Sequence, residues 1–376
     1  MISDKYQDLF NTVCQNDKKG PYSCFFINSP LFEKSNLGIR LTSDKGQKPT
    51  SLMFAPRFPK IASEEDLNRI FGTSLGEKYQ EAANGEGDEK KRLGVLHSSS
   101  LCALLLFSNV SEAHPLTMTI NGAPIAFSEV HFEFENTVFK DSKPSSIDVV
   151  LIDKGKKNVL FLESKFSEYF HGGRANVSEG YKNKYKELGI TIDDNKSDEG
   201  WHLATECIRK DKLGKTKKCI DSNGNPCYQL AHYHNKKDDS AKFYCGGLKQ
   251  MISHSIGVKN YIAGAPYPET KSRKINGKAN LQYKDLNHPN VYLGTILFDF
   301  ESKPSNDSES SSDQRLACYC EEYERLIEKI TKEEQVTWII KKPFLYRQDV
   351  LWNKNNKDYL SSLSREIVDF YQLSQK

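Results

Sequence analysis

The sequence predicts an α/β fold: a mixed β-sheet with helices packed on it, a large insertion, and further segments at both ends of the chain. Two apolar runs, residues 146–153 and 158–165, flank a short polar turn, which is the pattern of a β-hairpin. Residues 130–135 alternate between apolar and polar side chains, as expected of a half-buried strand. Helical patterns precede and follow these strands.

The core elements are expected in the order helix, strand, strand, strand, helix, strand. Their expected bounds, in chain order, are 98–109, 130–135, 146–153, 158–165, 242–258 and 290–300. Serines at the start of the first helix suit its N-cap, where a hydroxyl accepts a hydrogen bond from the backbone. Outside the core, a capped helix is predicted at 62–71, helical character at 167–188, and helices at 316–331 and within 345–375.

Polar stretches divide these elements into three regions. Residues 1–94 form an N-terminal mixed α/β region. The core spans 95–300 with an irregular polar insertion at about 189–240, and residues 301–376 form a helical region packed on the core. With 376 residues, of which 37% are hydrophobic, the chain can bury a core of this size.

Charge and cysteine content narrow the class of protein. A formal net charge of +3 gives no general attraction to nucleic acid, so such binding must depend on local basic patches, as at 154–157 and 209–218. The longest apolar run, residues 101–107, is too short to cross a bilayer, and no signal peptide is recognisable. Nine cysteines at irregular spacings do not form a secreted disulfide framework. We therefore expect a cytoplasmic protein without a membrane segment.

The hairpin carries three charged residues that its register brings together. If Gly155 and Lys156 form a two-residue turn, residues whose numbers sum to 311 face each other, and Asp148 lies opposite Glu163. Glu163 and Lys165 share a face because side chains alternate along a strand, and Asp148 joins them there. A turn one residue earlier leaves Asp148 on the face of Glu163 and Lys165, whereas a three-residue turn would place it on the other face. Such charges at the end of an apolar hairpin are costly unless a metal or substrate uses them.

The pattern Asp148…Glu163-Ser164-Lys165 resembles the PD-(D/E)xK nuclease superfamily, the fold of many restriction and repair nucleases. Within it, the chain is similar to a group of bacterial restriction endonucleases, chiefly over residues 95–170 and including the segment 97–105. Ile147 stands where the superfamily motif has proline, a common departure. The resemblance implies a restriction endonuclease-like core of order α-β-β-β-α-β, which agrees with the pattern of elements.

The resemblance also implies Mg²⁺-dependent hydrolysis of DNA phosphodiester bonds, with Asp148, Glu163 and Lys165 as catalytic residues. A divalent ion offsets charge on the phosphate and lowers the pKa of bound water. Asp148, Glu163 and the carbonyl of Ser164 would bind Mg²⁺, or Mn²⁺ as a substitute, because these ions accept oxygen ligands. Lys165 would orient the attacking water or stabilise the developing charge.

Four further residues are expected to support this site. Glu133 and Glu135 share a face of their strand, and Glu135, nearer its end, is the expected third metal-binding acid. Gln250 and His254 lie four apart on one face of the second core helix. Some relatives carry a glutamine and an aromatic residue at this spacing behind the active hairpin, and histidine replaces the aromatic residue here.

Other interpretations stay open. The same triplet pattern occurs at 141–143, 194–196 and 301–303, and Glu301 follows a good strand but lacks a preceding acid at hairpin distance. Six metal-capable residues around the insertion are too irregularly spaced for structural zinc to be expected: Cys207, Cys219, Cys227, His232, His234 and Cys245. The alternative functions are a non-catalytic nucleic-acid-binding protein on a nuclease scaffold, and a DNA repair or structure-selective nuclease, with RNA a further substrate class. Cutting both strands usually needs two active sites, so a homodimer is a reasonable expectation.

Overall fold

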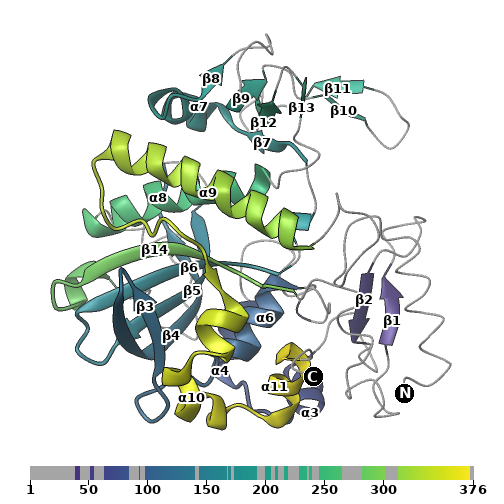
Figure 1. The fold of residues 1–376 in the computed structure, drawn as a ribbon, viewed down its shortest axis with the longest axis vertical. Helices are drawn as coiled ribbons and strands as arrows, with labels where there is room; N and C mark the ends of the chain where they lie inside the picture. Colours follow the sequence, from purple (N-terminus) through teal and green to yellow (C-terminus); the bar gives the residue numbers. More distant parts are fainter. Residues whose placement is uncertain are drawn as a thin grey trace.

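A six-stranded mixed sheet, in the order β15-β14-β6-β5-β4-β3, forms the centre of the computed structural model (Figure 1). The residues that the structure describes are 39–42, 51–54, 63–83, 93, 98–139, 144–166, 168–170, 173–192, 200–204, 208–210, 216–218, 228–234, 237–238, 245–264, 282–300 and 312–372. The six strands are β3 (Leu116–Ile120), β4 (Ala123–Asn136), β5 (Ser145–Asp153), β6 (Asn158–Lys165), β14 (Asn290–Leu297) and β15 (Phe344–Leu345). Neighbouring strands are antiparallel from β3 to β6, and β14 and β15 continue the sheet in parallel.

The β5–β6 hairpin has the predicted register. Its ladder begins with Val149 opposite Leu162, whose numbers sum to 311, and the later pairs keep that sum. In the turn, the N–H of Lys156 donates to the carbonyl of Asp153 at 2.9 Å, and Lys156 takes a positive φ of 52°. The turn therefore fixes which residues of the two strands face each other.

Helices cover both faces of the sheet (Figure 1). α8 (Cys245–Ile262) packs on β4, β5 and β14, and α9 (Ser312–Glu334) packs beside it. On the other face, α6 (Ser99–Phe107) packs on β5 and β6, and its N-cap Ser98 accepts a hydrogen bond from Leu101 N at 3.2 Å. The predicted core order of helix, three strands, helix and strand is therefore present as α6, β4, β5, β6, α8 and β14.

One predicted strand is much longer, and a neighbour was missed. β4 begins seven residues earlier than expected because it forms a second hairpin with β3. Asn121 and Gly122 form its turn, with φ values of 50° and 82°. Asn-Gly between alternating apolar residues favours this type of turn, so the sequence did contain the signal.

An early helix, α3, and the last described helix, α11, meet below the sheet in Figure 1. α3 (Glu64–Phe71) begins after Ser63, whose side chain accepts from Asp66 N, as the predicted capped helix requires. It packs on α11 (Arg365–Gln372), where the ring centroids of Phe71 and Phe370 lie 5.4 Å apart. Between β15 and α11 lie η4 (Tyr346–Leu351), a π-helix, then η5 (Lys354–Asn356) and α10 (Lys357–Ser362). α4 (Glu77–Ala83) packs on β4.

A second, smaller sheet follows the core hairpin and lies above α8 and α9 in Figure 1. Its order is β13-β12-β9-β8, and β7 also pairs with β12. The strands are β7 (Ala175–Val177), β8 (Thr191–Ile192), β9 (Gly200–Ala204), β12 (Tyr228–His234) and β13 (Lys237–Asp238). Among the described residues of the predicted helical stretch 167–188, only η2 (Glu168–Phe170) and α7 (Glu179–Glu187) are helical.

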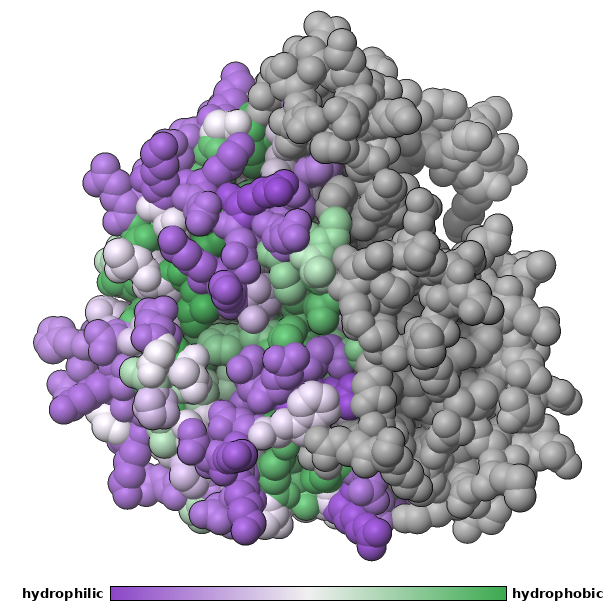
Figure 2. Space-filling view, viewed as in Figure 1, coloured by the Kyte–Doolittle hydropathy of each residue, from purple (hydrophilic) through white to green (hydrophobic). Residues whose placement is uncertain are grey.

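Two short strand pairs and the 3-10 helix η3 (Tyr283–Asp285) complete the described elements. The strand pairs are β1 (Ile39–Thr42) with β2 (Ser51–Phe54), and β10 (Ile208–Lys210) with β11 (Thr216–Lys218). In Figure 2 the described part of this face is largely polar, with apolar residues visible near the middle. Within the ranges given above, no helix combines the length and apolar character that crossing a membrane would require.

Candidate active site

Three adjacent strands bring acidic residues into one row of the sheet. The β4–β5 and β5–β6 ladders both pass through Val149, and the residues of the next row are Glu133, Asp148 and Glu163. Lys165 lies two residues beyond Glu163 and so projects from the same face. This corner is the first third of β5 and the carboxyl end of β6, where the strand pairing of the hairpin stops.

Glu163 is a buried carboxylate held between two basic groups. Its residue surface is 1% exposed. The ammonium of Lys165 donates to Oε1, and Nε2 of His254 lies 2.7 Å from Oε2. Burial raises the pKa of Glu163, but Lys165 and His254 outweigh this effect and lower it to about 2. Glu163 is therefore ionised at neutral pH.

His254 connects helix α8 to both strands of the hairpin. It is 2% exposed, and its Nδ1 lies 2.5 Å from Oγ of Ser145, the first residue of β5. One turn later, Gly257 allows the close approach of the helix, since a Cβ there would lie 2.9 Å from Cβ of Asn136. The predicted residue His254 thus reaches Glu163 because a glycine brings α8 against the strands.

Asp148 differs from Glu163 in its electrostatic environment. It is half-buried, and its Oδ2 accepts the backbone N–H of Ser164 at 2.7 Å. Burial raises the pKa of Asp148 well above its ordinary value, and the charge of Glu163 adds to this, against the opposing effect of Lys165. The row therefore holds two carboxyl groups whose pKa values are shifted in opposite directions.

Of the two acids on β4, Glu133 is the one associated with Asp148. Its carboxylate accepts a hydrogen bond from Oγ of Ser146 at 2.8 Å, and its charge contributes to the raised pKa of Asp148. Glu135 lies opposite Ser146, two rows away from Asp148. Both glutamates are buried, but the geometry favours Glu133 over the expected Glu135 as a third acid.

The structure also separates the two predicted residues of α8. His254 contacts Glu163, whereas the side chain of Gln250 forms no hydrogen bond with any residue that the structure describes. The sequence reasoning did not single out Ser145 and Ser146. Their position two and three residues before Asp148 was the available signal, since Ser146 shares the face of Asp148.

The chemistry of these residues fits Mg²⁺. The carboxylates of Asp148, Glu163 and Glu133 and the carbonyl of Ser164 are oxygen donors, the type that Mg²⁺ prefers. Within the described ranges, no three His, Cys, Asp or Glu side chains are already arranged as a metal site. The contacts explain this: Glu163 directs its oxygens to Lys165 and His254. Burial, and after it the charges of Glu163 and Glu133, raise the pKa of Asp148, and a divalent cation would favour its ionised form.

Other predicted features lie away from this corner or outside the described residues. The triplets 141–143, 194–196 and 301–303 are outside them, as are Cys207, Cys219 and Cys227. The basic turn 154–157 begins six residues along β5 from Asp148, about 20 Å away at the usual rise of a strand. It therefore lies at the opposite end of the hairpin from the acids.

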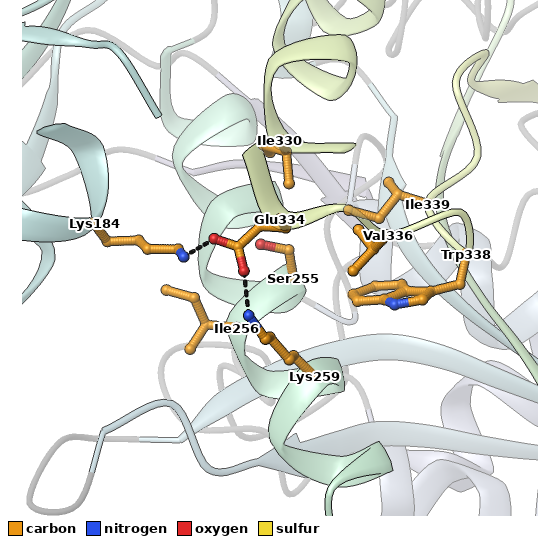
Figure 3. A pocket seen from close by; sticks show the side chains of 9 residues that line it. All are labelled: Lys184, Ser255, Ile256, Lys259, Ile330, Glu334, Val336, Trp338 and Ile339. Carbon is orange, nitrogen blue, oxygen red and sulfur yellow. Dashed lines mark hydrogen bonds and ion pairs between the residues drawn. The ribbon is translucent and has the colours of Figure 1, made fainter. Parts of the chain in front are cut away.

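A second cluster of charge joins three helices. Glu334, at the end of α9, accepts from Lys184 of α7 and from Lys259 of α8 (Figure 3). Val336 and Trp338 line the small hollow beside it. Because two ammonium groups already surround Glu334, the cluster is best explained as a clamp between the insertion and the core. A buried pair, His232 and Glu322 at 3.2 Å, similarly joins β12 to α9.

The comparisons with known proteins identify one family. A family model described as Restriction Endonuclease associating with ARP matches residues 46–235, just over half of the 376-residue chain. The matched segment contains Asp148, Glu163 and Lys165 but ends before α8, β14 and the C-terminal elements. No curated protein and no solved structure matches the chain.

Proposed function

The chain belongs to the family described as Restriction Endonuclease associating with ARP, and on that premise we propose that it is a Mg²⁺-dependent endonuclease that hydrolyses DNA in the manner of a restriction enzyme. The observation that carries the proposal is the juxtaposition of Asp148, Glu163 and Lys165 at the end of the β5–β6 hairpin. The order α6, β4, β5, β6, α8, β14 supports a restriction endonuclease-like core.

The roles of the residues follow from their contacts. Asp148, Glu163 and the carbonyl of Ser164 would hold the ion, with Glu133 as a further carboxylate. When bound, Mg²⁺ supplies a Lewis acid for the phosphate and lowers the pKa of a bound water. Lys165 has three ammonium donors, so its contact with Glu163 still allows it to orient water or to stabilise charge on the phosphate.

His254 has a positioning role in this proposal. Its imidazole holds one oxygen of Glu163 while Ser145 holds the imidazole, so Glu163 is fixed from α8 as well as from its own strand. Groups that orient metal-binding carboxylates in this way commonly change metal affinity or activity by 10–100-fold when removed. Gln250 has no comparable support in the contacts of the described residues.

The proposal is tested by incubating the protein with supercoiled plasmid and Mg²⁺ or Mn²⁺. We expect Lys165→Ala to cut at least about 100-fold more slowly than wild type, because a charge-stabilising group is lost. The matched control is Lys157→Ala, which removes a lysine from the opposite end of the same hairpin and should cut like wild type. Equal activity of wild type and Lys165→Ala would refute the proposal.

The same assay separates the alternative functions. DNA retained in gel shifts but never cut, with either ion, would favour a non-catalytic nucleic-acid-binding protein on a nuclease scaffold. Cleavage of branched DNA but not of plasmid would favour a repair or structure-selective nuclease, and RNA in parallel reactions tests the substrate class. Light scattering of the protein alone and with DNA tests the homodimer, which simultaneous cutting of both strands would require.

A further inference from the structure

We propose that Tyr346, in the C-terminal segment, is a positioning residue of the active site that acts through Ser164. This inference deepens the proposed function and rests on it. Tyr346 is the first residue of η4 and follows Ser164 by 182 residues, beyond the segment that the family model matches. It reaches the active hairpin from the face of the sheet opposite to the acids.

The contact between the two residues is buried and directional. Ser164 alternates with Glu163 and Lys165, so its side chain lies on the α6 face, where its Oγ donates to the carbonyl of Ser99 at 3.2 Å. The Tyr346 hydroxyl lies 2.8 Å from the same Oγ. Because Ser164 uses its one proton for Ser99, the hydrogen bond between the hydroxyls is donated by Tyr346. Ser164 and Tyr346 are both fully buried, so water does not replace this bond.

The backbone of Ser164 transmits this contact to the acids. Its N–H donates to Oδ2 of Asp148 at 2.7 Å, and its carbonyl is one of the oxygens proposed to bind Mg²⁺. Because Tyr346 holds the Ser164 side chain on the opposite face of the sheet, the peptide groups on either side of Ser164 have less freedom to rotate. We infer that the hydroxyl of Tyr346 keeps the carboxylate of Asp148 and the carbonyl of Ser164 in a geometry suited to one ion.

The π-helix that carries Tyr346 is itself anchored at the carboxyl end of β14. The N–H of Arg347 donates to Oδ1 of Asp299 at 2.8 Å, and its guanidinium donates to the carbonyl of Asp299 at 3.2 Å. The N–H of Phe298, next to Asp299, donates to the carbonyl of Lys165 at 2.9 Å. Residues 298–299, directly after β14, therefore contact both the end of β6 and the π-helix. Such π-helical turns are frequent at functional sites.

The test compares Tyr346→Phe with Tyr359→Phe. The Tyr359 hydroxyl is equally buried and donates to the carbonyl of Leu106 at 2.5 Å, away from the acids, so this control loses a similar hydrogen bond. The readouts are the rise in melting temperature during a titration with Mn²⁺ alone, and the kcat and KM of plasmid cleavage. For Tyr346→Phe, the Mn²⁺ concentration that gives half of the maximal rise in melting temperature should be about tenfold higher than for wild type. A tenfold change is what the loss of one buried hydrogen bond is expected to cause.

The kinetic expectation is a lower kcat with an unchanged KM for DNA in Tyr346→Phe, and neither change in Tyr359→Phe. Ser164→Ala removes the same hydrogen bond from the other side, so the double variant Ser164→Ala/Tyr346→Phe should be no worse than the more affected single variant. Additive effects of the two substitutions on the Mn²⁺ titration would overturn the inference.

The remaining outcomes distinguish this inference from the proposed function. If wild type cleaves DNA and Tyr346→Phe responds to Mn²⁺ like wild type and Tyr359→Phe, the inference fails and the proposed function stands. If Tyr346→Phe and Tyr359→Phe lose the Mn²⁺ response equally, the effect is one of general stability and the inference fails. A wild-type protein that neither cleaves nucleic acid nor responds to Mn²⁺ would refute both.

Discussion

Glu163 and Asp148 lie in one row of the sheet, yet their surroundings shift their pKa values in opposite directions. Glu163 contacts Lys165 and His254, which outweigh its burial, whereas the carboxylate of Asp148 accepts a hydrogen bond from the backbone of Ser164. Carboxylates whose neighbours separate their pKa values in this way often mark functional sites. The difference between the two pKa values thus depends on the contacts of single side chains.

His254→Ala should lower plasmid cleavage by about 10–100-fold, because Glu163 would lose the group that holds its Oε2. Cleavage rates at saturating Mg²⁺ and at a tenth of that concentration are the measurement, and the deficit should be larger at the lower concentration. Gln250→Ala, on the same face of α8, is the matched control and should behave like wild type. A similar loss in both variants would indicate damage to the helix instead.

Asp299 should make stability depend on pH. Burial raises its pKa to about 6, despite the N–H that it accepts from Arg347, whereas its ordinary value is 3.8. The folded protein therefore binds this proton more tightly than the unfolded chain, so stability should fall as the pH rises from about 4 to about 6. Two pKa units correspond to about 3 kcal/mol.

Urea denaturation of wild type and Asp299→Asn measures this effect, since the amide carries no charge at any pH. The free energy of unfolding of the variant minus that of wild type should rise by about 2.5 kcal/mol between pH 4 and pH 7, since the unfolded side chain is already partly ionised at pH 4. Other titrating groups are common to both proteins and cancel in the difference. A difference that stays constant across this range would contradict the assignment to Asp299.

At the scale of elements, α8 determines whether the site is assembled. It supplies His254, and it can approach β4 and β5 only because Gly257 has no side chain. Two residues after Gly257, the clamp of Lys184, Lys259 and Glu334 ties α8 to α7 and α9 (Figure 3). Both contacts thus fix the C-terminal half of the helix, and a change at the glycine should be transmitted to the active site.

Gly257→Ala should destabilise the protein by about 1–3 kcal/mol, because its Cβ would lie 2.9 Å from Cβ of Asn136 and one of the two elements must move. Cleavage should fall further than this loss of stability explains, since His254 moves with the helix. Thermal unfolding and cleavage at a temperature well below the transition are the measurements.

The control for this substitution is Gly180→Ala on α7. Its new Cβ would meet only the ring of Phe139, at 3.7 Å, an ordinary contact. Alanine favours a helix over glycine by up to about 1 kcal/mol, so the control should be as stable as wild type or slightly more stable. A Gly257→Ala protein that matches this control in stability and activity would show that the close approach is not required.

At the scale of the whole molecule, segments far apart in the sequence, α3 and α11, enter the same core. Phe71 of α3 packs on Phe370 of α11, and Ser364 donates to the carbonyl of Phe71. The ring centroids of Tyr371, in α11, and Phe298, directly after β14, lie 5.6 Å apart. Helix α11 therefore contacts both α3 and the end of β14. The division into regions 1–94, 95–300 and 301–376 stays a prediction, but these contacts cross its boundaries.

Phe370→Ala should therefore destabilise the whole molecule, by about 3–5 kcal/mol, because it removes a fully buried ring. The far-UV circular dichroism signal and the cleavage activity should both be lost in a single transition, at a lower temperature than in wild type. Val368→Ala, a half-buried position on the same helix, is the control and should cost clearly less. Two separate transitions in the variant would instead support independent regions.

The sequence by itself determined the hairpin, its register and the three charged residues on its end. Period-two alternation and a turn of fixed length specify which residues face each other, and both are local properties of the chain. The Asn-Gly signal of the β3–β4 hairpin was equally local, and a closer inspection of residues 116–129 would have found it. The helices at both ends of the chain were likewise predictable from their capping and periodicity.

Only the tertiary structure decided what surrounds those charges. His254 and Tyr346 come from 91 and 182 residues further along the chain, and nothing in their local patterns specifies which strand they contact. The preference for Glu133 over Glu135 likewise depends on the pairing of β4 with β5, because the two share a face of their own strand. Local sequence fixes periodicity and turns, whereas contacts between distant segments depend on how the layers pack.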